Sequence, residues 1–296
     1  MTGQAVAPHM DLTGALLRVR DALAGGTATL AAGVSDNYAH EERLAIRRAR
    51  AALRAGGPQL DPTLTRALVE DMRWLARLLG HVRDLDMAAE HMAARCPPAL
   101  WEAVGPCVAA ERAEALAHVR AGLASGRMDI LEDRLADAIQ QSRAVDPGDL
   151  ERAAARRARQ LVVRLQLAMA EPENLFGHEP LHELRKLLRN LRYTLELLPA
   201  RETAVCFAAL HAELHRLQDW FGHIQDLAVQ CGVLARIRRL YIAPSSPARP
   251  LLDAYAAEQA DQRDRLGARF PAVIAPLMEA IASCRLMERL HALVDA

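Results

Sequence analysis

The chain has 296 residues, 51% of them hydrophobic, and its formal net charge is zero. This size and composition allow a substantial core, and the charge balance excludes a globally basic protein of the histone type. A site for anions must therefore arise from local segregation of charge. Nearly all of the positive charge is arginine, since Lys186 is the only lysine. Guanidinium groups hold oxyanions by two-pronged hydrogen bonds, although a GC-rich gene would produce the same composition.

Five widely spaced cysteines without a C-x-x-C pair are typical of reduced thiols in a cytosolic protein. The N-terminus lacks a basic start followed by an apolar core, so no signal peptide is expected. The longest weakly polar stretch, near residues 22–34, is too short and too rich in Gly and Thr to span a bilayer. We therefore expect a soluble, cytoplasmic protein without a membrane span.

Helical periodicity runs through nearly the whole chain, whereas aromatic and β-branched residues are scarce. We therefore predict an all-α fold. Asp61-Pro62 indicates a helix start, with the aspartate as the cap and the proline at the first helical position. Breaks are expected at the Gly and Pro clusters Gly25–Gly26, Gly56–Pro58, Pro97–Pro98, Pro147–Gly148, Pro172–Pro180 and Pro244–Pro250.

Two of the predicted helices carry cations along one side. At about 100° per residue, the cations of the first helix fall within an arc of about 80°, and its apolar residues lie opposite. This first stripe consists of His40, Arg43, Arg47, Arg50 and Arg54. The second stripe lies opposite a face of leucines and consists of His182, Arg185, Arg189 and Arg192.

The two stripes belong to an internal repeat. The pattern His-Glu-x-Arg-x-x-x-Arg-x-x-Arg at residues 40–50 recurs at residues 182–192, an offset of 142 residues (182 − 40). The segment Gly80–Leu85 recurs as Gly222–Leu227 at the same offset (222 − 80 = 142). Two separate motifs in one register indicate two homologous helical halves.

The stripes are not neutralised from within their own helices. Neighbouring like charges on a helix repel by about 0.2–0.5 kcal/mol per pair, and the nearby acids Glu41, Glu42 and Glu183 point off the stripes. A polyanion or the acids of another helix must therefore balance them, and an interhelical salt-bridge network is the structural alternative. Glu196 stands at the repeat position of Arg54 and is expected at the rim of any site.

Together these motifs resemble the CHAD family, the conserved histidine α-helical domain. The segment Trp74–Asp86 is similar to the family's second-helix motif, which ends in Gly-x-x-Arg-Asp-x-Asp, and Leu217–Asp226 is similar to its looser second copy. The resemblance implies one domain, two four-helix bundle halves related by a pseudo-twofold axis around a basic central groove. The expected bounds are 1–296 for the domain, about 11–145 for the first repeat and about 150–296 for the second.

The resemblance also implies that the groove binds inorganic polyphosphate without catalysis. The expected contacts are His40, Arg43, Arg47, Arg50, Arg54, His182, Arg185, Lys186, Arg189 and Arg192. Secondary candidates are Arg48 and basic residues assigned to the third helix of each half, Arg112, His118, Arg120, Arg127, Arg263, Arg265 and Arg269. No cofactor, catalytic residue or metal ligand is expected.

Two other groups of residues suggest chemistry. A histidine cluster, His211, His215 and His223, could suggest a metal site, and His211 and His215 are one turn apart, as zinc ligands often are. However, the sequence lacks the glutamate of an HExxH motif and a third ligand at a convincing spacing. For Asp84 and Asp86 we expect a structural role, either capping a helix end or pairing with an arginine.

Three functions compete with polyphosphate binding. A nucleic-acid-binding protein would use the same arginines, but few aromatic residues are present to stack on bases. A scaffold protein on intracellular storage granules would dock an acidic partner on the stripes. An enzyme acting on polyphosphate would need a metal held by carboxylates or an activated nucleophile, and neither pattern is visible.

Overall fold

The computed structural model describes residues 11–31, 36–170, 178–198 and 206–295. In this part of the chain the elements are all helices, with no strand, so the predicted all-α fold is confirmed. Among the cysteines whose side chains are described, Cys96, Cys107 and Cys231 are free thiols.

The helices fall into two groups along the chain. The first comprises α1 (Leu12–Ala31), α2 (Asp36–Gly56), the short 3-10 helix η1 (Gly57–Gln59), α3 (Pro62–Arg95), α4 (Pro98–Leu123) and α5 (Gly126–Ser142). The second comprises α6 (Pro147–Ala170), α7 (His178–Leu195), α9 (Cys206–Leu240), α10 (Ala248–Ala268), α11 (Phe270–Ser283) and α12 (Leu286–Asp295).

Local signals place most helix ends. Asp61 caps α3, because its Oδ1 accepts a hydrogen bond of 2.7 Å from the backbone N–H of Thr63. Breaks expected from Gly and Pro are confirmed at Gly56–Pro58, Pro97–Pro98, Pro147–Gly148 and Pro244–Pro250. The break expected at Gly25–Gly26 is wrong, since α1 runs through both glycines to Ala31. Helix propensity is a weak preference that the surrounding structure overrides there.

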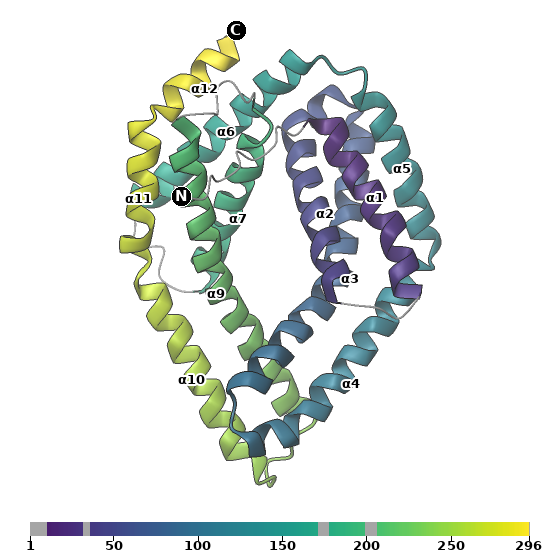
Figure 1. Cartoon of the computed structure of the whole chain (residues 1–296), viewed down its shortest axis with the longest axis vertical. Coiled ribbons are helices and arrows are strands. Elements are labelled where there is room, and N and C mark those ends of the chain that lie inside the picture. The colour runs from purple at the N-terminus through teal and green to yellow at the C-terminus, as the bar shows by residue number, and fades with distance from the viewer. Residues whose placement is uncertain (1–10, 32–35, 171–177, 199–205, 296) are drawn as a thin grey trace, which may run out of the picture.

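Figure 1 shows the two groups side by side. Helices α1, α2, α3 and α5 lie on one side, and α6, α7, α9, α11 and α12 lie on the other. The long helices α3 and α9 descend to the lower end, where α4 and α10 join them. The cationic helices α2 and α7 lie along the middle and pack against each other. The pseudo-twofold relation between the halves stays a prediction.

The described core consists of two separate clusters of buried side chains. The larger one takes up the apolar faces of both cationic helices, including Ile46 and Leu53 of α2 and Leu188 of α7. The smaller one lies at the lower end of α3 and α9 and includes Met92 and Leu234. Because the larger cluster fixes the apolar faces of α2 and α7, their arginine-bearing faces are turned away from it.

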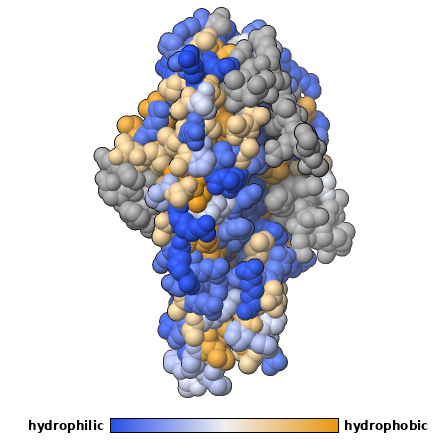
Figure 2. Space-filling model, turned by 60° about the vertical axis from the view of Figure 1, so that its left-hand side comes forward, coloured by the Kyte–Doolittle hydropathy of each residue, from blue (hydrophilic) through white to orange (hydrophobic). Residues whose placement is uncertain are grey.

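One helical stretch, Ala248–Ser283 across α10 and α11, is long and apolar enough to cross a membrane by length and composition. The expectation built on residues 22–34 overlooked this stretch. Core helices of soluble proteins pass the same test, and α11 buries Phe270, Ile274 and Leu277. Figure 2, which brings this side of the molecule forward, shows hydrophilic residues interspersed among the hydrophobic ones. The stretch is therefore weak support for a membrane span.

Candidate functional site

The arginines of α2 and α7 form one cluster, because the two helices pack together. The charge of Arg189 interacts with those of Arg47 and Arg50, and the charge of Arg185 interacts with those of Arg43 and Arg47. The two stripes of cations thus meet across the helix pair, although they are far apart in the sequence.

Arginines from two further helices join this cluster. On α3, Arg73 interacts with both Arg50 and Arg54, and on α6, Arg157 interacts with Arg54. Sequence reasoning missed these residues, although Arg73 and Arg77 are one helical turn apart, as the stripe residues are. We call the whole set the central arginine array: Arg43, Arg47, Arg50, Arg54, Arg73, Arg77, Arg83, Arg157, Arg185 and Arg189.

Much of the array is removed from water, which disfavours the charged form of a guanidinium group. Burial, followed by the neighbouring arginines, lowers the pKa of Arg50 and that of Arg189 to about 10. Both groups remain protonated at neutral pH. The Nε atoms of Arg47 and Arg50 are buried without a hydrogen-bond partner, and such an unsatisfied group costs about 1–3 kcal/mol. An acceptor that reached these donors would relieve this cost.

Few carboxylates balance the array within the described residues. One ion pair is formed there, in which Arg43 Nη1 and Asp84 Oδ1 are 4.0 Å apart. The repeat-related Asp226 interacts with Arg185. Burial raises the pKa of both carboxyl groups, while the arginines oppose that shift. Both aspartates lie inside continuous helices, so they are placed for pairing with arginine and not for capping a helix end.

The far end of the second stripe is arranged differently. Arg192 is only 6% exposed, and its Nε lies 3.7 Å from Glu196 Oε1. Glu196 also accepts a hydrogen bond of 3.2 Å from Arg48 Nε. Glu196 is 7% exposed, and its buried charge is balanced by the two arginines. That this end lies at the rim of a site stays a prediction. Arg192 and Arg48 are therefore engaged within the protein.

The two histidines and the lysine among the expected polyphosphate contacts lie outside the central arginine array as defined above. His40 belongs to α2, but its side chain lies outside the described residues. His182 Nδ1 donates a hydrogen bond of 3.0 Å to Gln225 Oε1, which links α7 to α9. Lys186 is paired with Glu183 on its own helix.

Most of the secondary candidates are paired with acids. Arg112 is bonded to Asp86, as expected for a carboxylate that pairs with an arginine. Arg127 lies 3.1 Å from Asp71 and stacks over the ring of Trp74 at 4.7 Å. The remaining pairs are Arg263 with Asp264 and Arg265 with Asp261. Arg120, His118 and Arg269 are exposed.

The described residues include no group of three or more His, Cys, Asp or Glu placed to hold a metal ion. His215 lies within hydrogen-bond distance of Arg192 Nη1 through both ring nitrogens, at 3.1 and 3.0 Å. Burial and then Arg192 lower the pKa of His215. A neutral imidazole that accepts from an arginine is accounted for without zinc.

A family model for the CHAD domain matches residues 14–235, which is more than half of the chain. The chain belongs to the CHAD domain family. The resemblance of the paired histidine-led motifs to this family is thereby confirmed.

Solved structures agree with this CHAD assignment. The crystal structure of the CHAD domain from the plant Ricinus communis has a TM-score of 0.70 and 19% identity, and covers 94% of this chain and 96% of that one. PptA from Streptomyces chartreusis has a TM-score of 0.62 and 18% identity, and covers 91% of this chain and 95% of that one. At such identities the likeness establishes the fold alone. Among curated proteins no relative matches.

Proposed function

We propose that this chain binds inorganic polyphosphate along the central arginine array and catalyses no reaction. The CHAD family is associated with polyphosphate binding in general. One observation carries the proposal for this chain. Arg47, Arg50 and Arg189 lie together, partly buried, and among the described residues no carboxylate lies within 4.0 Å of them.

The chemistry of the array suits a phosphate polymer. Each guanidinium presents several N–H donors in a planar fork, and phosphate oxygens accept them in pairs. Because α2 and α7 pack against each other, their arginines form adjoining rows that successive phosphates of one chain can follow. A bound polyanion replaces repulsion between arginines with attraction and releases the counterions of both partners.

The comparison of two charge-matched variants tests the proposal. Arg47→Ala combined with Arg189→Ala removes two cations from the array. Arg143→Ala combined with Arg239→Ala removes two exposed arginines from other helix ends and serves as the control. Two charge-assisted hydrogen bonds are worth about 1.5–3 kcal/mol each, so we expect a loss of at least about 100-fold for the array variant. Equal affinity of the array variant and the native protein would refute the site.

Two other partners use the same cations and are separated by competition. If duplex or single-stranded DNA displaces polyphosphate at equal phosphate concentration, the protein is a nucleic-acid binder. If an acidic protein of storage granules saturates the array and excludes polyphosphate, the chain is a docking module. We favour polyphosphate because it is a flexible phosphate chain without bases, and two aromatic rings near the array are already covered by arginines. Arg192 lies over Tyr193 at 4.6 Å, and Arg127 lies over Trp74 at 4.7 Å.

A further inference from the structure

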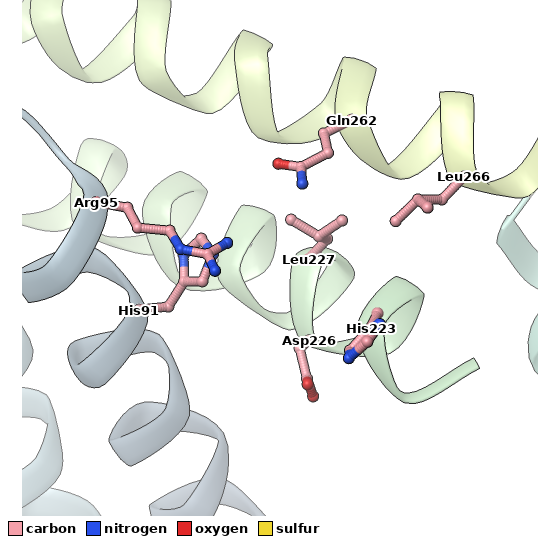
Figure 3. Close-up of a pocket in the computed structure, with 7 residues that line it drawn as sticks. All are labelled: His91, Arg95, His223, Asp226, Leu227, Gln262 and Leu266. Atoms are coloured by element: carbon pink, nitrogen blue, oxygen red, sulfur yellow. The ribbon is translucent and has the colours of Figure 1, made fainter. Parts of the chain in front are cut away.

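A cavity of about 310 Å³ lies between α3, α9 and α10 (Figure 3). His91 and Arg95 line it from α3, His223 and Asp226 from α9, and Gln262 from α10, together with two leucines. The cavity adjoins the central arginine array, because Asp226 interacts both with His91 and with Arg185 of the array. Its cations come from segments that are far apart in the sequence.

The protonation of His91 follows from its hydrogen bond. Arg95 Nη1 lies 3.1 Å from His91 Nε2, and an arginine only donates, so Nε2 accepts and carries no proton. Burial and the Arg95 charge lower the pKa of His91, which favours a neutral ring whose proton is on Nδ1. That Nδ1 atom is buried without a hydrogen-bond partner. His91, a residue that lines the cavity, thus holds a buried donor that lacks an acceptor.

The acid at the cavity does not cancel these donors. In Figure 3 the Asp226 carboxylate points away from Gln262 and α10. Its charge interacts first with Arg185 and then with His223 and Arg83, so it is directed largely towards the array. Arg95 and Gln262 supply donors on the side of the cavity away from the Asp226 carboxylate, and His223 lies beside Asp226 (Figure 3).

We propose that this cavity holds the terminal phosphate of a polyphosphate chain whose interior lies along the array. The inference rests on the proposed function and adds a specificity for chain ends. An interior phosphate needs room for the chain on both sides, whereas a terminal phosphate needs it on one side only. A terminal phosphate also carries a second acid proton with a pKa near 6, about that of a phosphate monoester. It therefore offers more negative charge to Arg95 and to the histidines than an interior phosphate does.

The test compares two small phosphates with the same number of phosphorus atoms. Linear tripolyphosphate has two ends, and cyclic trimetaphosphate has none. Affinities are measured by titration calorimetry for the native protein, for Arg95→Gln and for His91→Gln. His291→Gln is the control, because His291 is exposed on α12 and lies outside this cavity. We expect Arg95→Gln to weaken binding of linear tripolyphosphate about tenfold, since one charge-assisted hydrogen bond is lost. Binding of the cyclic compound should change little in every variant.

Effects of a substitution that are common to the two phosphates cancel when the linear-to-cyclic affinity ratio of a variant is divided by that of the native protein, and His91→Gln leaves the charge of a neutral ring unchanged. If this ratio is unchanged in Arg95→Gln and in His91→Gln, the end-group inference is wrong, even when long-chain polyphosphate still depends on Arg47 and Arg189. If long-chain binding ignores Arg47 and Arg189 while the ratio falls in Arg95→Gln, the array proposal is wrong and the cavity is a separate phosphate site. Arg95 is exposed, and an unchanged thermal midpoint of each variant shows that it is folded.

Discussion

Arg189 and Arg192 are neighbours on one face of α7, but the surroundings of their charges differ. Arg189 interacts mainly with other arginines, and burial lowers its pKa to about 10. Arg192 is more deeply buried, but Glu196, His215 and the ring of Tyr193 surround its guanidinium group. The difference between the two residues is therefore the presence of a counterion, and not their depth in the protein.

Substitutions at these two positions should change stability with opposite signs. Arg189→Gln should raise the free energy of unfolding by roughly 1–3 kcal/mol, because a buried unpaired charge is removed. Arg192→Gln should lower it by roughly 1–3 kcal/mol, because Glu196 loses one of its two partners. Urea denaturation at pH 7 measures both values. A lower stability of Arg189→Gln would show that the array holds its cations without strain.

The sign of the pH dependence follows from the direction of the Arg189 shift. Its folded-state pKa of about 10 lies below the ordinary arginine pKa expected for the unfolded chain. The folded state therefore binds fewer protons than the unfolded state between these values, and the penalty is fully present below about pH 10. The penalty is relieved as the pH rises through the folded pKa, so the stability gained by Arg189→Gln should shrink there.

At the scale of elements, close packing does not require glycine at the glycine positions of the repeated motif in the two long helices. A Cβ on Gly80 of α3 or on Gly222 of α9 would meet nothing within 4 Å. Gly80 lies one turn from Arg77 and one turn from Asp84, so it is on the face of α3 that adjoins the array. A Cβ on Gly122 of α4, in contrast, would collide with Leu78.

Alanine substitutions separate these cases. Gly80→Ala should stabilise the protein by about 0.5–1 kcal/mol, since glycine inside a helix is unfavourable. Gly122→Ala should destabilise it by about 1–3 kcal/mol, since close packing of α4 on α3 leaves no room for a methyl group. Thermal or urea unfolding measures both changes. A bulkier Gly80→Leu should leave the fold intact and weaken polyphosphate binding by filling space beside the array, and unchanged binding would place the ligand elsewhere.

At the scale of the whole molecule, zero net charge coexists with a concentrated patch of cations. Acids elsewhere compensate in number, but they do so as local pairs such as Arg238 with Asp253 and Arg236 with Glu111. The cations of the central arginine array, in contrast, gather where α2 and α7 meet. Under the proposed function, the cations of the array attract the polyanion to this place.

Salt dependence tests this distribution of charge. The logarithm of the association constant for long-chain polyphosphate should fall linearly with the logarithm of salt concentration, because counterions are released on binding. Removing two array cations, as in Arg47→Ala with Arg189→Ala, should reduce the slope by about two. The control variant at Arg143 and Arg239 should keep the native slope. A slope that is the same in all three proteins would contradict binding at the array.

Much of this arrangement was predictable because it depends on helix geometry alone. The rotation of about 100° per residue assigns Arg47 to one side of its helix and Ile46 to the other, and the structure buries Ile46 as expected. The capping of α3 by Asp61 is equally local. The glycine pair at residues 25–26 failed as a boundary because helix ends also depend on neighbouring helices.

By itself, the sequence determined that this chain is helical, that two of its helices carry arginines on one side, and that both belong to a repeat in one register. These properties are fixed by residues within a few turns of each other. Only the tertiary structure decided which arginines keep an unbalanced charge. Glu196 reaches Arg48 across 148 residues of chain, and Arg73 and Arg157 join the array from other helices. Coulomb energy depends on distance in space, and sequence spacing sets that distance only within a single helix.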